Sequence, residues 1–190
     1  MFRTFMDDAL EEAAKALKRG EVPVGAVIVE KSGTIIARAG NETRGRLDPS
    51  AHAEVLAIRK ACDTLKTDRL VNCDIYVTLE PCAMCAGLIA NARIRRLYFA
   101  AFDPKSGGIQ QGARVFDHKQ THHVPEIYSG IGEEKAAKLL SDAKFPVILS
   151  GAGVVIGNAI EDCKKIAEKL DAPVCNGCLL YTSPSPRDRG

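Results

Sequence analysis

The sequence predicts an α/β fold in which helices cover the faces of a central mixed sheet. Short apolar strand patterns alternate with helical patterns along residues 2–142, an order typical of this class. The length of 190 residues suffices for one domain of ordinary size and a fragment of a second. The composition, 46% apolar and 26% charged, is that of a folded globular chain.

The first segment, residues 2–19, has apolar side chains at helical intervals, with acidic residues early and basic residues late. This charge order favours a helix because it complements the helix dipole, and Gly20 is a natural end for it. Residues 24–29 and 34–39 have strand patterns separated by a turn that contains Gly33. We therefore expect a helix followed by two neighbouring strands.

A polar loop over residues 41–49 then leads into a second helix, which we expect to end near Leu65. Residues 75–78 and 95–101 each predict a strand, and the helix between them ends near Ala92. This alternation of strands and helices indicates that helices lie on the faces of the sheet.

The following part of the chain contains a loop and two shorter elements. Residues 102–116 are rich in glycine, and we expect this loop to form the rim of the functional site. Residues 122–127 indicate one more short strand. Residues 132–142 predict a helix whose apolar residues face inward.

Two short motifs contain the residue types that bind a transition metal. The first is His52-x-Glu54, at the start of the second helix, and the second is Pro81-Cys82-x-x-Cys85. One imidazole and two thiolates suit tetrahedral zinc and leave its fourth position open to water. A carboxylate beside that water, Glu54, can accept a proton and later return it, as a hydrolytic site requires.

The alternatives are a structural zinc knuckle and a chance pair of cysteines. A structural site needs a fourth Cys or His at short spacing, and His52 is the only such residue between Gly20 and Cys62. The nearest spare thiol, Cys73, lies at the head of an apolar strand pattern, where we expect it to be buried. We therefore favour a catalytic site.

The net charge, the cysteine count and the distribution of acidic and apolar residues disfavour several classes of protein. A net charge of +2 does not by itself indicate a nucleic-acid binder, and seven irregularly spaced cysteines do not resemble a disulfide scaffold. Acidic residues within the first twelve argue against a targeting peptide, and no apolar run has the length of a membrane span. We expect a cytoplasmic protein with no membrane partner.

From residue 1 to about residue 142 the sequence resembles the bacterial tRNA-specific adenosine deaminases of the cytidine deaminase-like superfamily. The His-x-Glu and Pro-Cys-x-x-Cys motifs are those of zinc deaminases in general. The tRNA-specific group is indicated by three longer stretches taken together, Asp48–Glu54, Glu80–Gly87 and Asp103–Gly108.

The resemblance implies a three-layer α/β/α fold with a central mixed sheet. It also implies that His52, Cys82 and Cys85 bind Zn²⁺ and that Glu54 is the proton shuttle. His122 and His123 are further candidate ligands, but we expect a loop or surface role for them because three protein ligands suffice.

The implied reaction is the hydrolytic conversion of a wobble adenosine to inosine in tRNA, with release of ammonia. Asn41 would contact the flipped nucleotide, and Phe102, Asp103 and Lys105 would lie along the anticodon loop. The family works as a homodimer. Six basic residues flank the predicted site elements and would form a rim for phosphates, an ordinary solvated surface being the alternative. These are Arg44, Arg46, Arg93, Arg95, Arg96 and Lys105.

After residue 142 the chain changes character. Residues 145–150 and 173–175 predict two strands, with a Gly-rich turn and a helical pattern between them. A lone βαβ unit cannot cover both faces of its strands, so we expect an orphan fragment over residues 143–177. The spacing of its glycines is not that of a dinucleotide-binding turn.

Residues 136–176 resemble the start of the central domain of thiamine-diphosphate enzymes, and sulfoacetaldehyde acetyltransferase most of all. No thiamine site is carried over, because the other domains of those enzymes hold most of the cofactor. Residues 178–190 resemble translated adapter sequence, and their composition predicts disorder. The expected division is a deaminase domain (1–142), a βαβ fragment (143–177) and a disordered tail (178–190).

Residues 136–142 fit both the last helix of the deaminase and the helix before the thiamine-enzyme strand. A joint inside such a shared stretch is what an assembly of two unrelated coding sequences produces, and we interpret the tail in this way. The aromatic and basic C-terminal turn usual in these deaminases would then be missing. Its loss bears on tRNA affinity and stability rather than on zinc chemistry.

Three rival functions remain at the level of sequence. The nearest is a deaminase of a free nucleobase or nucleotide, of the guanine, cytosine or dCMP class, built on the same zinc core. Another is a non-catalytic zinc-bearing module that binds RNA. A thiamine-dependent transferase is the third, and the short fragment cannot support it.

Overall fold

The computed structural model describes residues 4–142, 148–150 and 174–176. The chain divides into two compact units, Met1–Ala143 and Lys144–Gly190.

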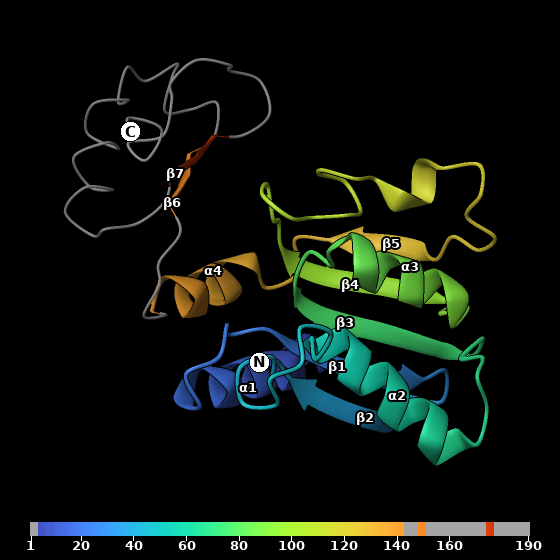
Figure 1. The fold of residues 1–190 in the computed structure, drawn as a ribbon. Helices are drawn as coiled ribbons and strands as arrows, with labels where there is room; N and C mark the ends of the chain where they lie inside the picture. The colour runs from blue at the N-terminus through green and yellow to red at the C-terminus, as the bar shows by residue number, and fades with distance from the viewer. Residues whose placement is uncertain (1–3, 143–147, 151–173, 177–190) are drawn as a thin grey trace. The chain divides into compact units, whose positions relative to one another are not determined.

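The first unit is built on a five-stranded mixed sheet, with the strand order β2-β1-β3-β4-β5 (Figure 1). β1 is antiparallel to both of its neighbours, whereas β3, β4 and β5 are parallel. The strands in chain order are β1 (Gly25–Glu30), β2 (Ile35–Gly40), β3 (Cys73–Leu79), β4 (Arg96–Ala101) and β5 (Glu126–Ser129). The helices are α1 (Phe5–Lys18), α2 (Ala53–Leu65), α3 (Ala83–Asn91), the short 3-10 helix η1 (Val115–Asp117) and α4 (Glu133–Ser141).

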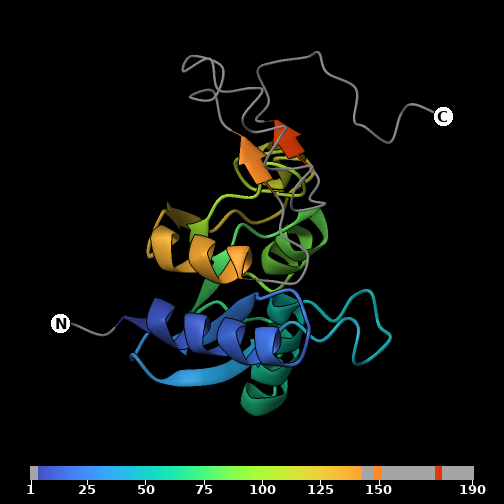
Figure 2. The same cartoon turned by 90° about the vertical axis from the view of Figure 1, so that its left-hand side faces the viewer.

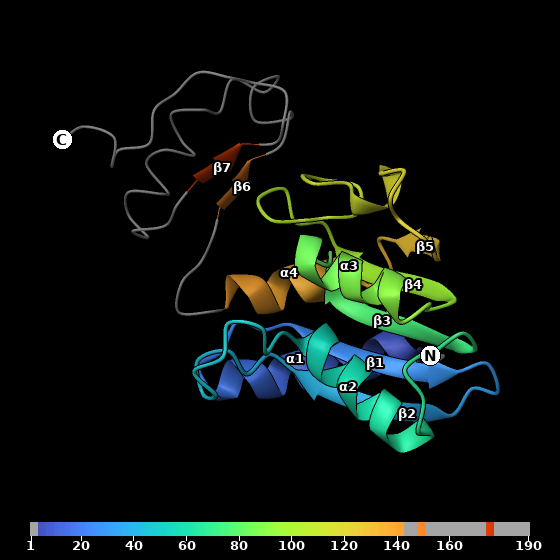
Figure 3. The same ribbon diagram turned by 45° about the vertical axis from the view of Figure 1, so that its right-hand side comes forward.

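Helices cover both faces of this sheet, which confirms the predicted three-layer α/β/α fold. α2 and α3 pack with one hydrophobic core cluster, and α1 and α4 with the other. α2 and α3 lie in front of the sheet in Figure 3, and Figure 2 shows α3 and α4 on opposite sides of it. Successive side chains of β3 point to opposite faces of the sheet. Ile75 and Val77 face α2 and α3, while Tyr76 packs on Phe5 of α1.

α1 follows the pattern that predicted it. At its start the Thr4 N–H donates to Asp7 Oδ2 at 2.9 Å, and beyond its end Gly20 has a φ of 78°, as a helix-terminating glycine does. The helix lies very close to β1, because a Cβ on Gly25 would be 2.0 Å from Ala9 O and 2.5 Å from Ala13 N. Gly25 is therefore required by the packing of a helix on a strand.

The last strand differs from its predicted position. We expected it over residues 122–127, but β5 begins at Glu126, whose N–H donates to Arg95 O at 3.1 Å. Pro125 has no N–H and cannot donate to the β4 ladder, so pairing begins only after it. The helix predicted over residues 132–142 is confirmed as α4, with Ala136 buried.

In the second unit the structure describes two short parallel strands, β6 (Ile148–Ser150) and β7 (Val174–Asn176). They match the strands expected there. The helix expected between them and the tail at residues 178–190 lie outside the described residues. Within the described part of the chain, no helix is long and apolar enough to cross a membrane.

Candidate metal centre and active site

Two helix N-termini bring the predicted metal-binding residues together. His52 is the N-cap of α2 and Cys82 is the N-cap of α3, each with an extended backbone, and Cys85 lies in the first turn of α3. β3 runs directly into Glu80-Pro81-Cys82, and proline is well tolerated where a helix begins. The two motifs therefore meet at the carboxyl end of β3, where α/β proteins commonly bind ligands.

The distances between these side chains fit one tetrahedral metal ion. His52 Nδ1 lies 3.7 Å from Cys82 Sγ and 3.5 Å from Cys85 Sγ, and the three ligand atoms lie within 4.8 Å of one another. Ordinary zinc bond lengths in a tetrahedron put a nitrogen and a sulfur ligand about 3.6 Å apart. The donor set and its spacing therefore suit zinc, and within the described residues it is the only such group.

The charge state of the two thiols agrees with this assignment. The pKa of Cys82 is lowered to about 4, because hydrogen bonds from Cys85 and His52 favour its thiolate more than burial opposes it. The pKa of Cys85 is raised by its hydrogen bond to Cys82 and by burial. The hydrogen bond to Cys82 also raises the pKa of His52. A metal ion binds the thiolate form of both side chains, so its binding releases protons.

Glu54 lies two residues into α2 and is only 3% exposed. Burial raises the pKa of its carboxyl group above the ordinary value. A buried carboxyl group with a raised pKa holds a proton more readily than an exposed one, which is a property expected of a proton shuttle.

A cavity of about 220 Å³ opens onto these groups. Its lining includes three of the predicted ligands and catalytic groups, His52, Glu54 and Cys82, and two predicted substrate-binding residues, Asn41 and Asp103. The full lining is Val22, Val24, Asn41, Thr43, His52, Glu54, Leu79, Glu80, Cys82, Asp103 and Ser106.

The other two predicted substrate-binding residues do not line the cavity. Phe102 packs edge-on against Phe99, with ring centroids 5.4 Å apart. Lys105 is exposed. Both belong to the loop that contributes Asp103 and Ser106 to the cavity wall.

Comparison with known proteins identifies the family. The family model of the cytidine and deoxycytidylate deaminase zinc-binding region matches residues 2–101. The tRNA-specific adenosine deaminase of Agrobacterium fabrum is 52% identical over 136 residues, which cover 72% of this chain and 89% of that protein. This chain belongs to the tRNA-specific adenosine deaminase family. The prediction of a zinc-dependent deaminase is thereby confirmed.

Solved structures agree with this membership. One comes from biochemical and structural studies of A-to-I editing by tRNA:A34 deaminases at the wobble position; it is 52% identical, has a TM-score of 0.70, and the match covers 72% of this chain and 98% of that one. A guanine deaminase from Nitrosomonas europaea has a TM-score of 0.64 at 23% identity, with 73% of this chain and 81% of that chain covered, and shares the fold alone. The family model of the thiamine pyrophosphate enzyme central domain matches residues 134–179.

Two buried carboxylates of this deaminase were not predicted from sequence as parts of the site. Glu21 is 5% exposed and accepts hydrogen bonds from Asn41 Nδ2 at 3.3 Å and from Gly45 N at 2.8 Å. Glu80 lines the cavity and is 2% exposed. The available signal for Glu80 was its position between an apolar strand and a Pro-Cys pair, where a side chain is buried.

The predicted basic rim is wrong for three of its six members. Arg93 and Arg95 precede β4 and Arg96 is its first residue, whereas the cavity is at the carboxyl end of the parallel strands. Two of them form ion pairs there, since Arg95 contacts Asp74 at 2.7 Å and Arg96 contacts Glu126 at 2.7 Å. These arginines are close in sequence to the loop after β4 that contributes to the cavity wall. The length of β4 nevertheless separates them from the cavity.

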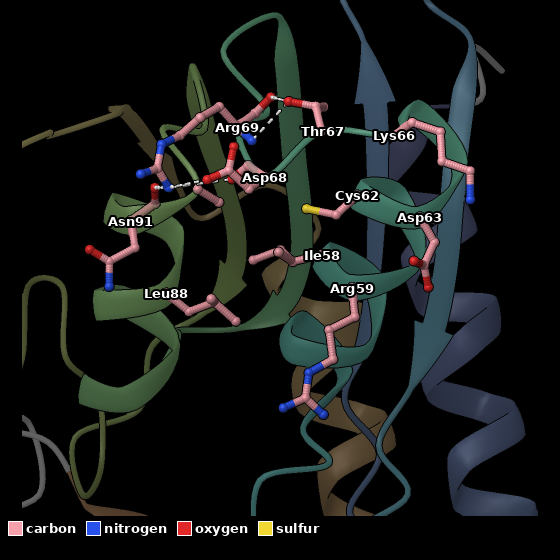
Figure 4. A pocket seen from close by; sticks show the side chains of 11 residues that line it. Ile58, Arg59, Cys62, Asp63, Lys66, Thr67, Asp68, Arg69, Leu88 and Asn91 are labelled. Atoms are coloured by element: carbon pink, nitrogen blue, oxygen red, sulfur yellow. Dashed lines mark hydrogen bonds and ion pairs between the residues drawn. The ribbon is translucent and has the colours of Figure 1, made fainter.

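A larger groove of about 690 Å³ lies between α2 and α3 on the outer side of the domain (Figure 4). Ile58 and Leu88 point toward each other across it, and charged residues such as Arg59 and Arg69 also line it. The metal-binding group lies outside this groove. The groove is therefore a surface feature separate from the cavity at His52, Glu54 and Cys82.

Proposed function

We propose that this chain converts adenosine to inosine at the wobble position of tRNA by zinc-dependent hydrolytic deamination. The observation that carries the proposal is the buried Glu54 carboxyl group beside the His52, Cys82 and Cys85 group, at a cavity that admits a single base. The close match to a tRNA-specific adenosine deaminase supports the choice of substrate.

His52, Cys82 and Cys85 hold the zinc ion in this proposal. When bound, zinc supplies a water of lowered pKa at its open coordination position. Glu54 would take one proton from the attacking water and give it to the adenine ring, and would then take the second proton from the new C6 hydroxyl group and give it to the C6 amino group. The oxygen of the water would remain on C6 as the carbonyl of inosine, while the C–N bond breaks and ammonia leaves.

The size of the cavity is compatible with a flipped nucleotide and also with a free base, so the choice of RNA rests on the relatives. At about 220 Å³ it is smaller than the roughly 300–1,000 Å³ pockets of drug-sized ligands, so one base fits and the rest of the substrate stays outside. Asn41 and Asp103 contact the base or its ribose from the wall. Phe102 and Lys105, on the adjoining loop, contact the neighbouring anticodon nucleotides.

We also propose that the deaminase domain comprises residues 1–142 and acts as a homodimer in the cytoplasm. The apolar floor of the groove between α2 and α3, with Ile58 and Leu88, is the kind of surface that a second copy covers (Figure 4). The described cysteines are free thiols, which agrees with a reducing compartment.

The experiment that tests the substrate compares RNA with free bases. Full-length chain is incubated with an anticodon stem-loop carrying a wobble adenosine, and separately with adenine, guanine and cytosine. We expect inosine in the stem-loop, with an affinity that falls steeply as salt rises, because several phosphates are contacted. Turnover of a free base, without salt dependence and without inosine in RNA, would favour the small-substrate deaminase.

A further inference from the structure

Glu80 is a buried carboxylate that no step of the proposed reaction uses. It follows β3 and precedes Pro81, and its side chain is 2% exposed. Its own N–H donates to Ala101 O at 2.8 Å, which ties the residue to the end of β4. The carboxylate therefore lies between the ends of two neighbouring strands.

Four backbone N–H groups of one loop donate to this carboxylate. Oε1 accepts from Ile109 at 3.1 Å, from Gln110 at 2.8 Å and from Gln111 at 2.9 Å. Oε2 accepts from Asp103 at 3.1 Å. The loop of residues 103–111 therefore wraps around a single charged group, in the way that consecutive N–H groups enclose an anion.

The loop is also shaped to fit closely around Glu80. A Cβ on Gly107 would lie 2.6 Å from Glu80 Cδ, so no larger residue fits there without movement. Gly108 N donates to Pro81 O at 2.8 Å, and Gly107 forms an isolated bridge with Cys82. The same loop thus contacts the carboxylate and the backbone of a metal-binding residue.

We propose that Glu80 is the positioning residue that holds the 103–111 loop, and with it the cavity wall, in register with the metal centre. Asp103 and Ser106 reach the cavity from this loop. Glu80 adjoins Pro81-Cys82 in sequence, so one side chain fixes the distance between the substrate wall and the metal-binding residues. The inference rests on the proposed function for its kinetic consequence but not for its structural one.

Glutamine is a sharp test of this role because it keeps the size of the side chain. In Glu80 both oxygens accept hydrogen bonds, whereas an amide presents one oxygen and one NH₂. Whichever way the amide turns, its NH₂ faces an N–H donor of the loop. Glu80→Gln therefore breaks the enclosure without opening a cavity.

The matched control is Asp74→Asn at the other end of β3. Asp74 is also a buried carboxylate, 7% exposed, and it accepts from Arg95 Nε at 2.8 Å. It lies far along the strand from the cavity, so its substitution tests a general loss of stability. Gly107→Ala is the second variant, because its methyl group disturbs the same enclosure from the loop side.

The test measures zinc content, amide hydrogen exchange over residues 103–111 and steady-state kinetics on the stem-loop, in the full chain. For Glu80→Gln we expect one zinc per chain, faster exchange in the loop, and a KM raised roughly tenfold with a smaller change in kcat. Gly107→Ala should have the same effects. The two substitutions together should raise KM and loop exchange no more than either one alone. Asp74→Asn should leave loop exchange and KM as they were.

Unchanged loop exchange in a folded, zinc-bound Glu80→Gln variant would overturn the proposal, as would an equal rise of KM in Asp74→Asn. Loss of zinc with normal loop exchange would also overturn it, because Glu80 would then act on the metal site. If Glu80→Gln does not fold, Gly107→Ala gives the same readouts. If the unsubstituted chain makes no inosine, the proposed function fails, while loop exchange and zinc content still decide the role of Glu80.

Discussion

His52 and Cys82 show how single residues acquire their chemistry from their places in helices. Each is an N-cap, where the unpaired N–H groups and the dipole of the helix favour a negative charge. Hydrogen bonds from Cys85 and His52 lower the pKa of Cys82 to about 4, and the helix N-terminus is a place that suits the resulting thiolate. Cys73, by contrast, is buried in β3, and burial raises its pKa to about 11.

Cys85 and Cys73, which are both buried, allow a matched prediction. We expect Cys85→Ser to abolish stoichiometric zinc binding, because it removes one of three protein ligands. Cys73→Ser should retain one zinc per chain and lose only stability, because it puts a hydroxyl group into the core. Metal analysis of the two purified variants checks this. Full zinc in Cys85→Ser would contradict the assigned ligand set.

At the scale of elements, the close packing of α1 on β1 depends on one glycine. Gly25→Ala would put a methyl group 2.0 Å from Ala9 O, and we expect it to destabilise the domain by about 1–3 kcal/mol. Gly87→Ala is the control: no atom lies within 4 Å of its added Cβ, in the interior of α3. It should be neutral or stabilising by up to about 1 kcal/mol. Denaturant unfolding that ranks the two variants in the opposite order would contradict this packing.

The loop between β2 and α2 is fixed by Glu21, and its stability should depend on pH. Burial opposes ionisation of Glu21, but the N–H groups of Gly45 and Arg44 favour the carboxylate and lower its pKa below 4.5. Because the pKa of Glu21 is lower in the folded chain, Glu21 contributes fully to folding stability above pH 4.5. This contribution is lost as the pH falls through the pKa of Glu21 in the folded chain.

We therefore expect the Tm of the unsubstituted chain to fall more steeply on acidification than that of Glu21→Gln. Thermal unfolding between about pH 3 and about pH 6 measures the two slopes. Parallel curves for the two proteins would show that Glu21 contributes no pH dependence.

At the scale of the whole molecule, the two compact units predict the effect of a truncation. The strands of the deaminase sheet all lie before residue 130, and the division between the units falls at Ala143. We expect a chain ending at Ala143 to keep one zinc and the Tm of the full chain. Size-exclusion chromatography, thermal unfolding and metal analysis check this, and aggregation of the shortened chain would contradict it.

The order of elements and the grouping of His52, Cys82 and Cys85 were predictable because each depends on local pattern: strand alternation, helical periodicity and the His-x-Glu and Pro-Cys-x-x-Cys spacings. The start of β5 was not, because the ladder of β4 and the missing N–H of Pro125 decide it. Nor was the enclosure of Glu80, whose partners lie 23 to 31 residues away. Contacts of that separation depend on how the elements pack.

The central claim is that Glu54 carries protons beside a metal held by His52, Cys82 and Cys85, and one measurement tests it most directly. This is the single-turnover rate of inosine formation on the anticodon stem-loop, measured with Glu54→Gln and the unsubstituted chain at equal zinc content. The account predicts a rate lower by about 10²–10⁴-fold in Glu54→Gln, with one zinc per chain and unchanged RNA binding. Rates within a few-fold of each other would contradict it.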